Sequence, residues 1–373
     1  MERENEEASL RPNERIHKIL LSTPAHFVGE FDRPDLLLSH AWPPIYTGRG
    51  RWTKYGEDSL NRTALVLAFR TPPPPEPAPG GIVPNYEGAG EGVASALSVL
   101  FGKRFDSHGP FEMSGSFGLP DLSAFATPCL PHLRHNDGKP RGDRAIPLNL
   151  SEVSRIESLL LGPNQDPRFS AFHSAAKFYR RALATVEIDA ESAYLNLITA
   201  GEIVSNSQKL TDEATLDSEV RAVLEHIAKE MPDGLKTANF LRGRLRGIKR
   251  RFVSAITAMV DDSFFNHREV QSHWGALRRS DFEKRLGAAY DLRSRFVHSG
   301  YPFGGWITAH MGKFEVQVGR PVVPDKEMAK VLAMAPLFSG LERVIRYVLL
   351  TLAAELGAVV EVKSEAQPEK GVD

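Results

Sequence analysis

The sequence predicts an α+β protein, in which a Pro/Gly-rich domain of mixed or irregular structure at residues 1–150 precedes an all-α helical bundle at residues 151–357. Three observations lead to this prediction. Pro and Gly dominate the first part, segments with helical periodicity dominate the second, and 373 residues suffice for about two domains. Residues 358–373 are expected to form a charged, disordered tail.

The overall charge excludes some classes of function. The chain carries 46 Lys and Arg and 47 Asp and Glu, so its net charge is −1. This balance excludes a globally basic nucleic-acid binder but leaves room for a local basic patch. The single Cys129 cannot form an intramolecular disulfide, which favours a reducing, cytoplasmic location. No secretory signal opens the chain and no uncharged stretch is long enough to span a membrane, so we expect no membrane association.

The N-terminal part offers few regular signals. The charged residues 1–16 are expected to fray. An apolar run at 63–69 predicts a strand, and apolar side chains at helical spacing predict a helix over 92–105. The proline-rich stretch at 71–81 favours an exposed polyproline II loop. Such a loop can bind an SH3-type partner, but a plain loop is the favoured interpretation because the motif is common.

Helical signals become regular after residue 150. Residues 151–161 predict a short helix. Asp166 starts a second helix, and Asp189 caps a third that runs over 190–206. A fourth helix is predicted over 216–229.

A fifth helix is predicted over 235–260. Ser280 and Glu283 have the spacing of a capping box, which starts a sixth helix that runs towards His298.

The last segments of this part are an insert and a helix. Alternation over 306–322 predicts a hairpin insert, and a final helix over 325–357 is broken at Pro336. The periodic apolar positions of this part predict a shared core that contains Phe252, Ile256, Leu341, Ile345 and Leu349.

The pattern most suggestive of chemistry lies at the end of the predicted helix that reaches His298. Arg293 precedes His298 by five positions, and the stretch 299–302 breaks the helix just beyond. In a regular helix, such positions are rotated by about 140° from each other. Arg293 and His298 therefore converge on one ligand only if the helix ends or bends there.

The segment Tyr290-Asp-Leu-Arg-Ser-Arg-Phe-Val-His-Ser-Gly300 resembles the Arg-x4–6-His signature of the HEPN superfamily, and most closely its Apea-like branch. The predicted helix from Ala193 to Val204 is similar to an upstream helix of that branch, with Glu202 in the acidic position and Gly201 where Leu is usual. The resemblance covers roughly residues 150–357 and implies a HEPN-like bundle.

The resemblance also implies roles for individual residues and a reaction. It implies Arg293 and His298 as catalytic residues, and it implies a set of supporting residues: Glu202, Tyr290, Ser294 and Arg295. The implied reaction is metal-independent cleavage of RNA by a homodimer, with no metal and no cofactor. RNA carries its own nucleophile, the ribose 2′-OH. His298 can transfer its proton, and Arg293 can hold the scissile phosphate.

We therefore expect a metal-independent RNA endonuclease of the HEPN type, acting in phage defence or a stress response. RNA is the expected partner, and residues 1–150 are expected to be a recognition module for a protein or ligand trigger. A second interpretation stays open, in which Arg293 pairs with Asp291, Glu202 or a helix terminus and His298 only caps its helix. The protein would then be a catalytically inactive HEPN-like scaffold that binds RNA, nucleotide or protein.

A basic stripe follows the predicted helix over 235–260. Arg242, Arg246, Lys249 and Arg250 lie along one flank of an apolar stripe, with no acidic residue on that helix to neutralise them. Such a surface attracts a phosphate backbone, and we expect these four residues to bind RNA. The alternative is a solvated face that acidic residues of a neighbouring helix compensate.

Two further motifs in the N-terminal part point only weakly to a ligand. Cys129, His132, His135 and Asp137 offer metal-ligand side chains at close spacing, but there is no second Cys pair, so a turn-rich loop is favoured over a metal site. The glycines of the stretch 88–92 precede a predicted helix, as in phosphate-binding loops. Neither a preceding strand nor a following Lys completes that motif, so nucleotide binding is not expected.

Overall fold

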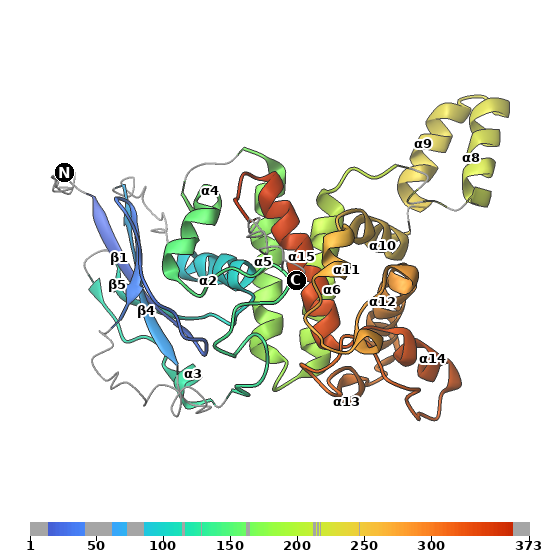
Figure 1. Ribbon diagram of the computed structural model, residues 1–373. Coiled ribbons are helices and arrows are strands. Elements are labelled where there is room, and N and C mark those ends of the chain that lie inside the picture. Colours follow the sequence, from blue (N-terminus) through green and yellow to red (C-terminus); the bar gives the residue numbers. More distant parts are fainter. Residues whose placement is uncertain are drawn as a thin grey trace, which may run out of the picture.

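The fold is α+β: an antiparallel sheet near the N-terminus is followed by a large helical region (Figure 1). The computed structural model describes the following residues: 14–41, 62–72, 86–113, 116–127, 129–161, 165–211, 214, 216, 218–245 and 247–360.

The sheet contains six strands in the described part of the chain, in the order β2-β3-β4-β1-β5-β6, and neighbouring strands are antiparallel. The strands are β1 (Arg15–Thr23), β2 (Phe31–Arg33), β3 (Leu36–His40), β4 (Thr63–Thr71), β5 (Asp106–Met113) and β6 (Ser116–Phe117). The predicted strand over 63–69 is confirmed as β4.

The central strand β1 was missed by the sequence reasoning. Residues 1–16 were expected to fray, yet Arg15 pairs with Thr71 in β4. The pairing of β1 with β4 continues without a shift to Thr23 opposite Thr63. The sequence of β1 alone does not clearly predict a strand, because His17 and Lys18 interrupt its apolar residues. Its strand state depends on the partners on both sides.

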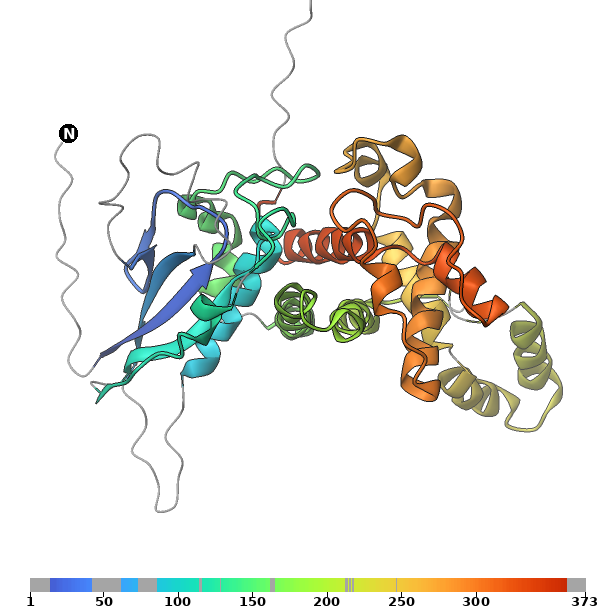
Figure 2. The same cartoon turned by 90° about the horizontal axis from the view of Figure 1, so that it is seen from below.

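Helix α2 (Glu87–Phe101) covers one face of the sheet (Figures 1 and 2). It approaches β1 closely at Gly90, where a Cβ atom would lie 2.7 Å from the Cγ2 atom of Ile19. The helix ends at Gly102, whose φ of 62° lies in the left-handed region that favours glycine. The predicted helix over 92–105 therefore begins five residues earlier and ends four residues earlier than expected.

The helical region follows in the order η1, α4, α5, α6, α8 to α15. Its principal helices are α5 (Pro167–Thr185), α6 (Ala190–Ser207), α8 (Ser218–Glu230), α9 (Gly234–Leu245), α10 (Ile248–Ala258), α12 (Phe282–Ser299), α14 (Lys326–Met334) and α15 (Phe338–Glu355). The short elements of this region are η1 (Leu150–Ile156), α4 (Glu157–Leu160), α11 (Asp262–Asn266), η2 (His273–Gly275), η3 (Arg279–Asp281) and α13 (Gly304–Ile307), and the short helix α3 (Ser123–Ala126) precedes it.

Several predicted features of this region are confirmed. The side chains of Asp166 and Asp189 cap α5 and α6 by accepting hydrogen bonds from backbone N–H groups. The predicted break at Pro336 separates α14 from α15. Five predicted core residues are fully buried: Phe252, Ile256, Leu341, Ile345 and Leu349.

The predicted single helix over 235–260 is wrong. The chain leaves the helix between α9 and α10, where Gly247 has an extended conformation (φ −68°, ψ 120°). Leu241 packs in a small separate cluster of the α8–α9 hairpin, whereas Phe252 and Ile256 belong to the main core. One straight helix could not serve both clusters. Figures 1 and 2 show this hairpin projecting from the rest of the molecule.

The predicted hairpin over 306–322 is also wrong, because this segment contains no pair of strands and begins within α13. The backbone N–H groups of Glu315 and Val316 both donate to the carbonyl of Gly275. Val316 forms an isolated bridge with Pro336. The predicted capping box of Ser280 is absent as well, since α12 begins after Asp281 with no side-chain cap.

The sheet and the helical region share one continuous hydrophobic cluster that runs from Ile19 to Val360. The composition therefore changes near residue 150, but the core does not stop there. Ala358 and Val360 are buried in this cluster, so these two residues do not belong to a disordered tail. Val359 between them is exposed, and its backbone N–H donates to the carbonyl of Arg155, whereas residues 361–373 lie outside the described residues.

Buried charges also cross this junction. Arg141 donates two hydrogen bonds to Glu269, at 2.7 Å each, and two to Glu342, at 2.7 and 2.8 Å. Arg346 of α15 binds Asp143 at 2.8 Å and donates to the carbonyls of Val99 and Leu100 at the end of α2. These contacts link the last helix to the end of α2 and to the loop before η1.

Candidate functional site

Helix α12, which contains Arg293 and His298, packs beside α6 and α10, and Glu202 of α6 faces it. The hydroxyl of Tyr290 donates to Oε1 of Glu202 at 2.8 Å. Nη2 of Arg293 lies 3.4 Å from Oε2 of the same carboxylate. The Arg293 guanidinium also lies 5.5 Å from the centre of the Tyr290 ring. Glu202 therefore holds the two α12 side chains in one arrangement.

Helical geometry explains this arrangement. Tyr290 and Arg293 are three positions apart, so they share one face of α12. Burial, followed by the hydrogen bond to the Glu202 carboxylate and its negative charge, raises the pKa of Tyr290 to about 12. The tyrosine hydroxyl therefore stays protonated and donates to Glu202 over the whole physiological range. The Arg293 side chain remains 29% exposed and can contact a ligand.

The close approach of α6 depends on Gly201. A Cβ atom at this position would lie 2.5 Å from Cε2 of Phe252 and 3.0 Å from Cδ1 of Ile345. A leucine, which the Apea-like pattern has at this position, would not fit without movement of α10 or α15. Gly201 therefore lets α6 lie directly against Phe252 of α10 and Ile345 of α15.

His298 lies on the last turn of α12 and is exposed. Its side chain makes no hydrogen bond or ion pair with any residue that the structure describes. Helix α12 stays regular through Ser299 and ends at Gly300, whose φ is 64°. Because no bend separates them, Arg293 and His298 point about 140° apart and about 7.5 Å apart along the axis. The expected convergence within one chain is therefore not realised.

The side chains of the other two supporting residues, Ser294 and Arg295, make no hydrogen bond or ion pair with Glu202, Tyr290 or Arg293. Nη1 of Arg295 lies 3.5 Å from the Asp325 carboxylate, which also caps the N-terminus of α14. Ser294 is half-buried and shares the helix face of His298, four positions away. The structure thus groups Glu202, Tyr290 and Arg293, and leaves Ser294, Arg295 and His298 outside this group.

The basic stripe is divided by the break between α9 and α10. Arg242 lies on α9, where it donates to Asn239 at 2.7 Å, and Arg246 lies outside the described residues. Lys249 and Arg250 lie at the start of α10. Nζ of Lys249 contacts both carboxylate oxygens of Asp291, at 2.6 and 2.7 Å, which brings it next to α12.

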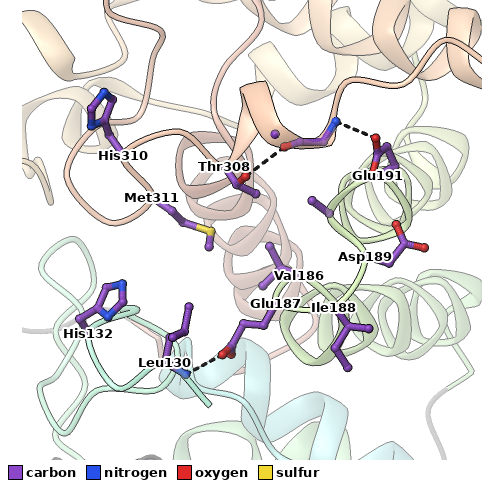
Figure 3. A pocket seen from close by; sticks show the side chains of 13 residues that line it. Leu130, His132, Val186, Glu187, Ile188, Asp189, Glu191, Thr308, His310 and Met311 are labelled. Atoms are coloured by element: carbon purple, nitrogen blue, oxygen red, sulfur yellow. Dashed lines mark hydrogen bonds between the residues drawn. The ribbon is translucent and has the colours of Figure 1, made fainter. Parts of the chain in front are cut away.

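A cleft of about 640 Å³ opens between the loop around Leu130, the turn that joins α5 to α6, and α13 (Figure 3). Its acidic side chains are used by the scaffold. Glu187 accepts from the backbone N–H of Leu130 at 2.5 Å, and Glu191 accepts from that of Gly304 at 2.7 Å. No residue of α12 lines this cleft, so it is separate from the Glu202 group.

The Cys129 to Asp137 stretch forms turns that the protein interior holds in place. Burial raises the pKa of the Cys129 thiol and lowers the pKa of His135. Asp137 pairs with the buried ammonium of Lys103. Within the described ranges, no three His, Cys, Asp or Glu side chains gather in a way that could hold a metal ion.

The predicted glycine stretch at 88–92 does not precede a helix, because it lies inside α2. Its Glu91 forms ion pairs with Lys177 and Arg180 of α5, at 3.0 and 3.1 Å. Burial opposes the charge of Glu91, but the two cations lower its pKa below the ordinary value. This stretch therefore attaches α2 to α5 and offers no phosphate-binding loop.

A serine–histidine pair that the sequence reasoning missed links two neighbouring strands of the sheet, β1 and β5. The hydroxyl of Ser22 and Nε2 of His108 are 2.7 Å apart, and Nδ1 of His108 lies 2.6 Å from the carbonyl of Asp121. Nε of Arg62 donates to the same hydroxyl at 2.9 Å. Ser22 is fully buried, so the pair is closed to substrates and serves to join β1, β4 and β5.

Comparison with known protein families, curated proteins and solved structures finds no match to this chain. In the part of the chain that the structure describes, no helix combines the length and the apolar character needed to cross a bilayer.

Proposed function

We propose that the protein is a metal-independent RNA endonuclease of the HEPN type, with its C-terminal half as the HEPN-like bundle. The observation that carries the proposal is the arrangement on α12. Glu202 and Tyr290 orient a partly exposed Arg293, and an exposed His298 ends the same helix. A cation that holds the phosphate and an imidazole that transfers a proton are the two groups that can promote phosphodiester cleavage by a ribose 2′-OH.

The active unit in this proposal is a homodimer. Arg293 and His298 of one copy point in different directions, so a single chain does not supply both groups to one phosphate. Two copies related by a two-fold axis near the ends of α12 would place Arg293 of one copy opposite His298 of the other. Val297 and Tyr301, which are 55% and 43% exposed beside His298, offer apolar surface for such a contact.

The reaction then follows from the side chains. His298 accepts the proton of the 2′-OH or donates a proton to the leaving 5′ oxygen. Arg293 holds the non-bridging phosphate oxygens and offsets the charge that develops in the transition state. The products are a 2′,3′-cyclic phosphate and a free 5′-hydroxyl, and DNA is inert because it lacks the nucleophile.

The test is cleavage of labelled RNA in the presence of EDTA by the wild type and by two variants. His298→Ala should lower the rate by about 10²–10⁴-fold, and Arg293→Ala by about 10²–10³-fold. His226→Ala, which removes another exposed histidine on α8, is the matched control and should retain full activity. Equal rates for the wild type and His298→Ala, or a requirement for a divalent cation, would reject the proposal.

A second candidate is the inactive scaffold, and the Arg293–Glu202 ion pair is the observation that favours it. In this case Arg293 is a structural residue whose charge Glu202 neutralises. Glu202→Gln separates the two candidates, because it removes the negative charge and keeps the shape of the side chain. Under the scaffold proposal this variant changes only stability. Under the endonuclease proposal it also changes the cleavage rate.

A further inference from the structure

Both tryptophans that the structure describes are exposed, Trp274 by 55% and Trp306 by 36%. Tryptophan is usually well buried, so an exposed tryptophan indicates a surface that can bind a ligand or partner. The Trp274 ring centre lies 4.8 Å from that of Phe314, and the His310 ring centre lies 5.5 Å from that of Phe314. Trp274, His310 and Phe314 therefore form a cluster of three rings at the surface, which we call the aromatic platform.

The backbone holds the platform in place. The N–H groups of Glu315 and Val316 donate to the carbonyl of Gly275, at 2.7 and 3.3 Å. Gly275 itself allows Phe314 to lie against the chain, because a Cβ atom there would be 2.5 Å from Cδ1 of the ring. His310 has a φ of 52°, a left-handed conformation that is uncommon for residues other than glycine and that is enriched at functional sites.

The surroundings of the platform are basic. Lys313 and Arg278 are exposed and make no ion pair with any described residue. Residues 270–280 contain no Asp or Glu, and residues 299–324 contain only Glu315. Glu315 is fully buried, where it accepts hydrogen bonds from Arg343 and from the backbone of Leu277, so it does not reach the surface.

Acidic side chains of the adjoining cleft also have partners within the protein, among them Asp189, which caps α6. His310 borders the cleft of Figure 3, whose Glu187 and Glu191 bind backbone N–H groups. The buried Glu269, which precedes the platform in the chain, is paired with Arg134 and Arg141. Exposed rings beside unpaired cations are the features that single-stranded nucleic acids recognise, through base stacking and phosphate contacts.

We infer that the aromatic platform binds single-stranded nucleic acid, with bases stacked on Trp274 and Phe314 and phosphates bound by Lys313 and Arg278. Binding itself does not depend on the 2′-OH, because every base has a face that can stack. The platform therefore takes single-stranded DNA as well, which a ribose-dependent nuclease cannot cleave.

The test uses fluorescein-labelled oligothymidylate as an uncleavable probe, with anisotropy for affinity and tryptophan emission for stacking. Trp274→Ala should weaken binding by about tenfold, because stacking one base contributes at that level. Trp274→Phe keeps a ring, so it should retain most of the affinity while the quenching of tryptophan emission falls. Lys313→Ala should reduce the slope of log Kd against log salt by about 0.7, as expected for one phosphate contact on a single strand.

Two controls make the test specific. Phe117→Ala removes another exposed ring, 83% exposed on β6, and should leave the affinity unchanged. A duplex of the same sequence should bind equally to the wild type and to Trp274→Ala, because its bases are not free to stack. If the wild type binds no oligothymidylate, or if Trp274→Ala binds as tightly as the wild type, the platform assignment is rejected and the cleavage proposal is untouched. Conversely, Trp274-dependent binding without any RNA cleavage upholds the platform and rejects the nuclease.

Discussion

Arginine–glutamate ion pairs occur in two regions of the molecule, where the sheet and the helical region meet at α15 and on the surface of α12. The two regions differ in how far the charged groups are removed from water. Arg141 is 1% exposed and surrounded by Glu269 and Glu342, whereas Arg293 is 29% exposed with one carboxylate at 3.4 Å. Burial opposes charge, yet the two carboxylates hold the pKa of Arg141 well above its ordinary value. The comparison teaches that full desolvation commits a cation to its partners, while partial exposure leaves it free to exchange them for a ligand.

The sharpest test of this contrast is Arg141→Ala. The change leaves Glu269 and Glu342 buried without their main partner, and breaking a buried pair in this way costs about 3–5 kcal/mol. We expect a loss of that size in the free energy of unfolding measured with urea. Arg33→Ala is the control, because Arg33 and Glu157 form an ion pair that is 40% and 35% exposed. That surface pair contributes about 0–1 kcal/mol. Similar losses for the two variants would contradict the comparison.

A second test uses the titration of the buried Lys103. Burial lowers the pKa of this ammonium to about 8, although Asp137 opposes the shift. Between about pH 8 and the ordinary lysine value, the unfolded chain therefore binds more protons than the folded protein, and stability from this group rises with pH. Relative to Lys103→Met, the wild type should gain up to about 1.4 kcal/mol per pH unit in this window.

The measurement for Lys103 is the unfolding free energy of both proteins from pH 7 to pH 10. Lys103→Arg is the matched variant, because a guanidinium stays charged throughout this range and should lack the gain. A difference between wild type and Lys103→Met that is independent of pH would show that the ammonium does not titrate in the folded state.

The smallest expected effects concern the basic residues of α9 and α10, of which Lys249 is exposed and Arg242 and Arg250 are half-buried. Lys249→Ala combined with Arg250→Ala should cost less than about 1 kcal/mol in stability, since exposed ion pairs contribute little. The same double variant should weaken RNA binding for unrelated sequences alike and reduce the salt slope by about 1.4, two phosphates at 0.7 each. An unchanged slope in fluorescence anisotropy would indicate a face that is only solvated. Arg242→Ala tests the α9 part of the divided stripe separately.

Part of this architecture follows from local sequence patterns. Asp166 and Asp189 cap their helices, Pro336 separates α14 from α15, and residues 63–69 form a strand, all as predicted. Each of these features depends on a side chain that acts on its own neighbouring backbone, or on a short apolar run. Such interactions involve few residues and little long-range context, so the sequence is sufficient to predict them.

Other features could not be predicted from neighbouring residues in the sequence. The stripe from Leu241 to Ile256 has continuous helical periodicity, but its two ends pack in different hydrophobic clusters and the chain breaks at Gly247. The buried ion pairs of α15 are a second example. In the sequence they are indicated by Glu342, Arg343 and Arg346, three charged residues that interrupt a run of apolar core residues. Arg343 pairs with Glu315, 28 residues before it, whereas its other partners and those of Glu342 and Arg346 come from positions more than 70 residues away.

By itself, the sequence determined the α+β class, the helix caps and the Arg293 and His298 positions on one helix near its end. Tertiary structure alone decided that Glu202 reaches Tyr290 and Arg293, and that Trp274 meets Phe314 at the surface. The physical reason is the distance along the chain over which each interaction acts. Capping and periodicity act within a few residues of chain, whereas desolvation and side-chain contacts depend on which distant segments the folded core brings together.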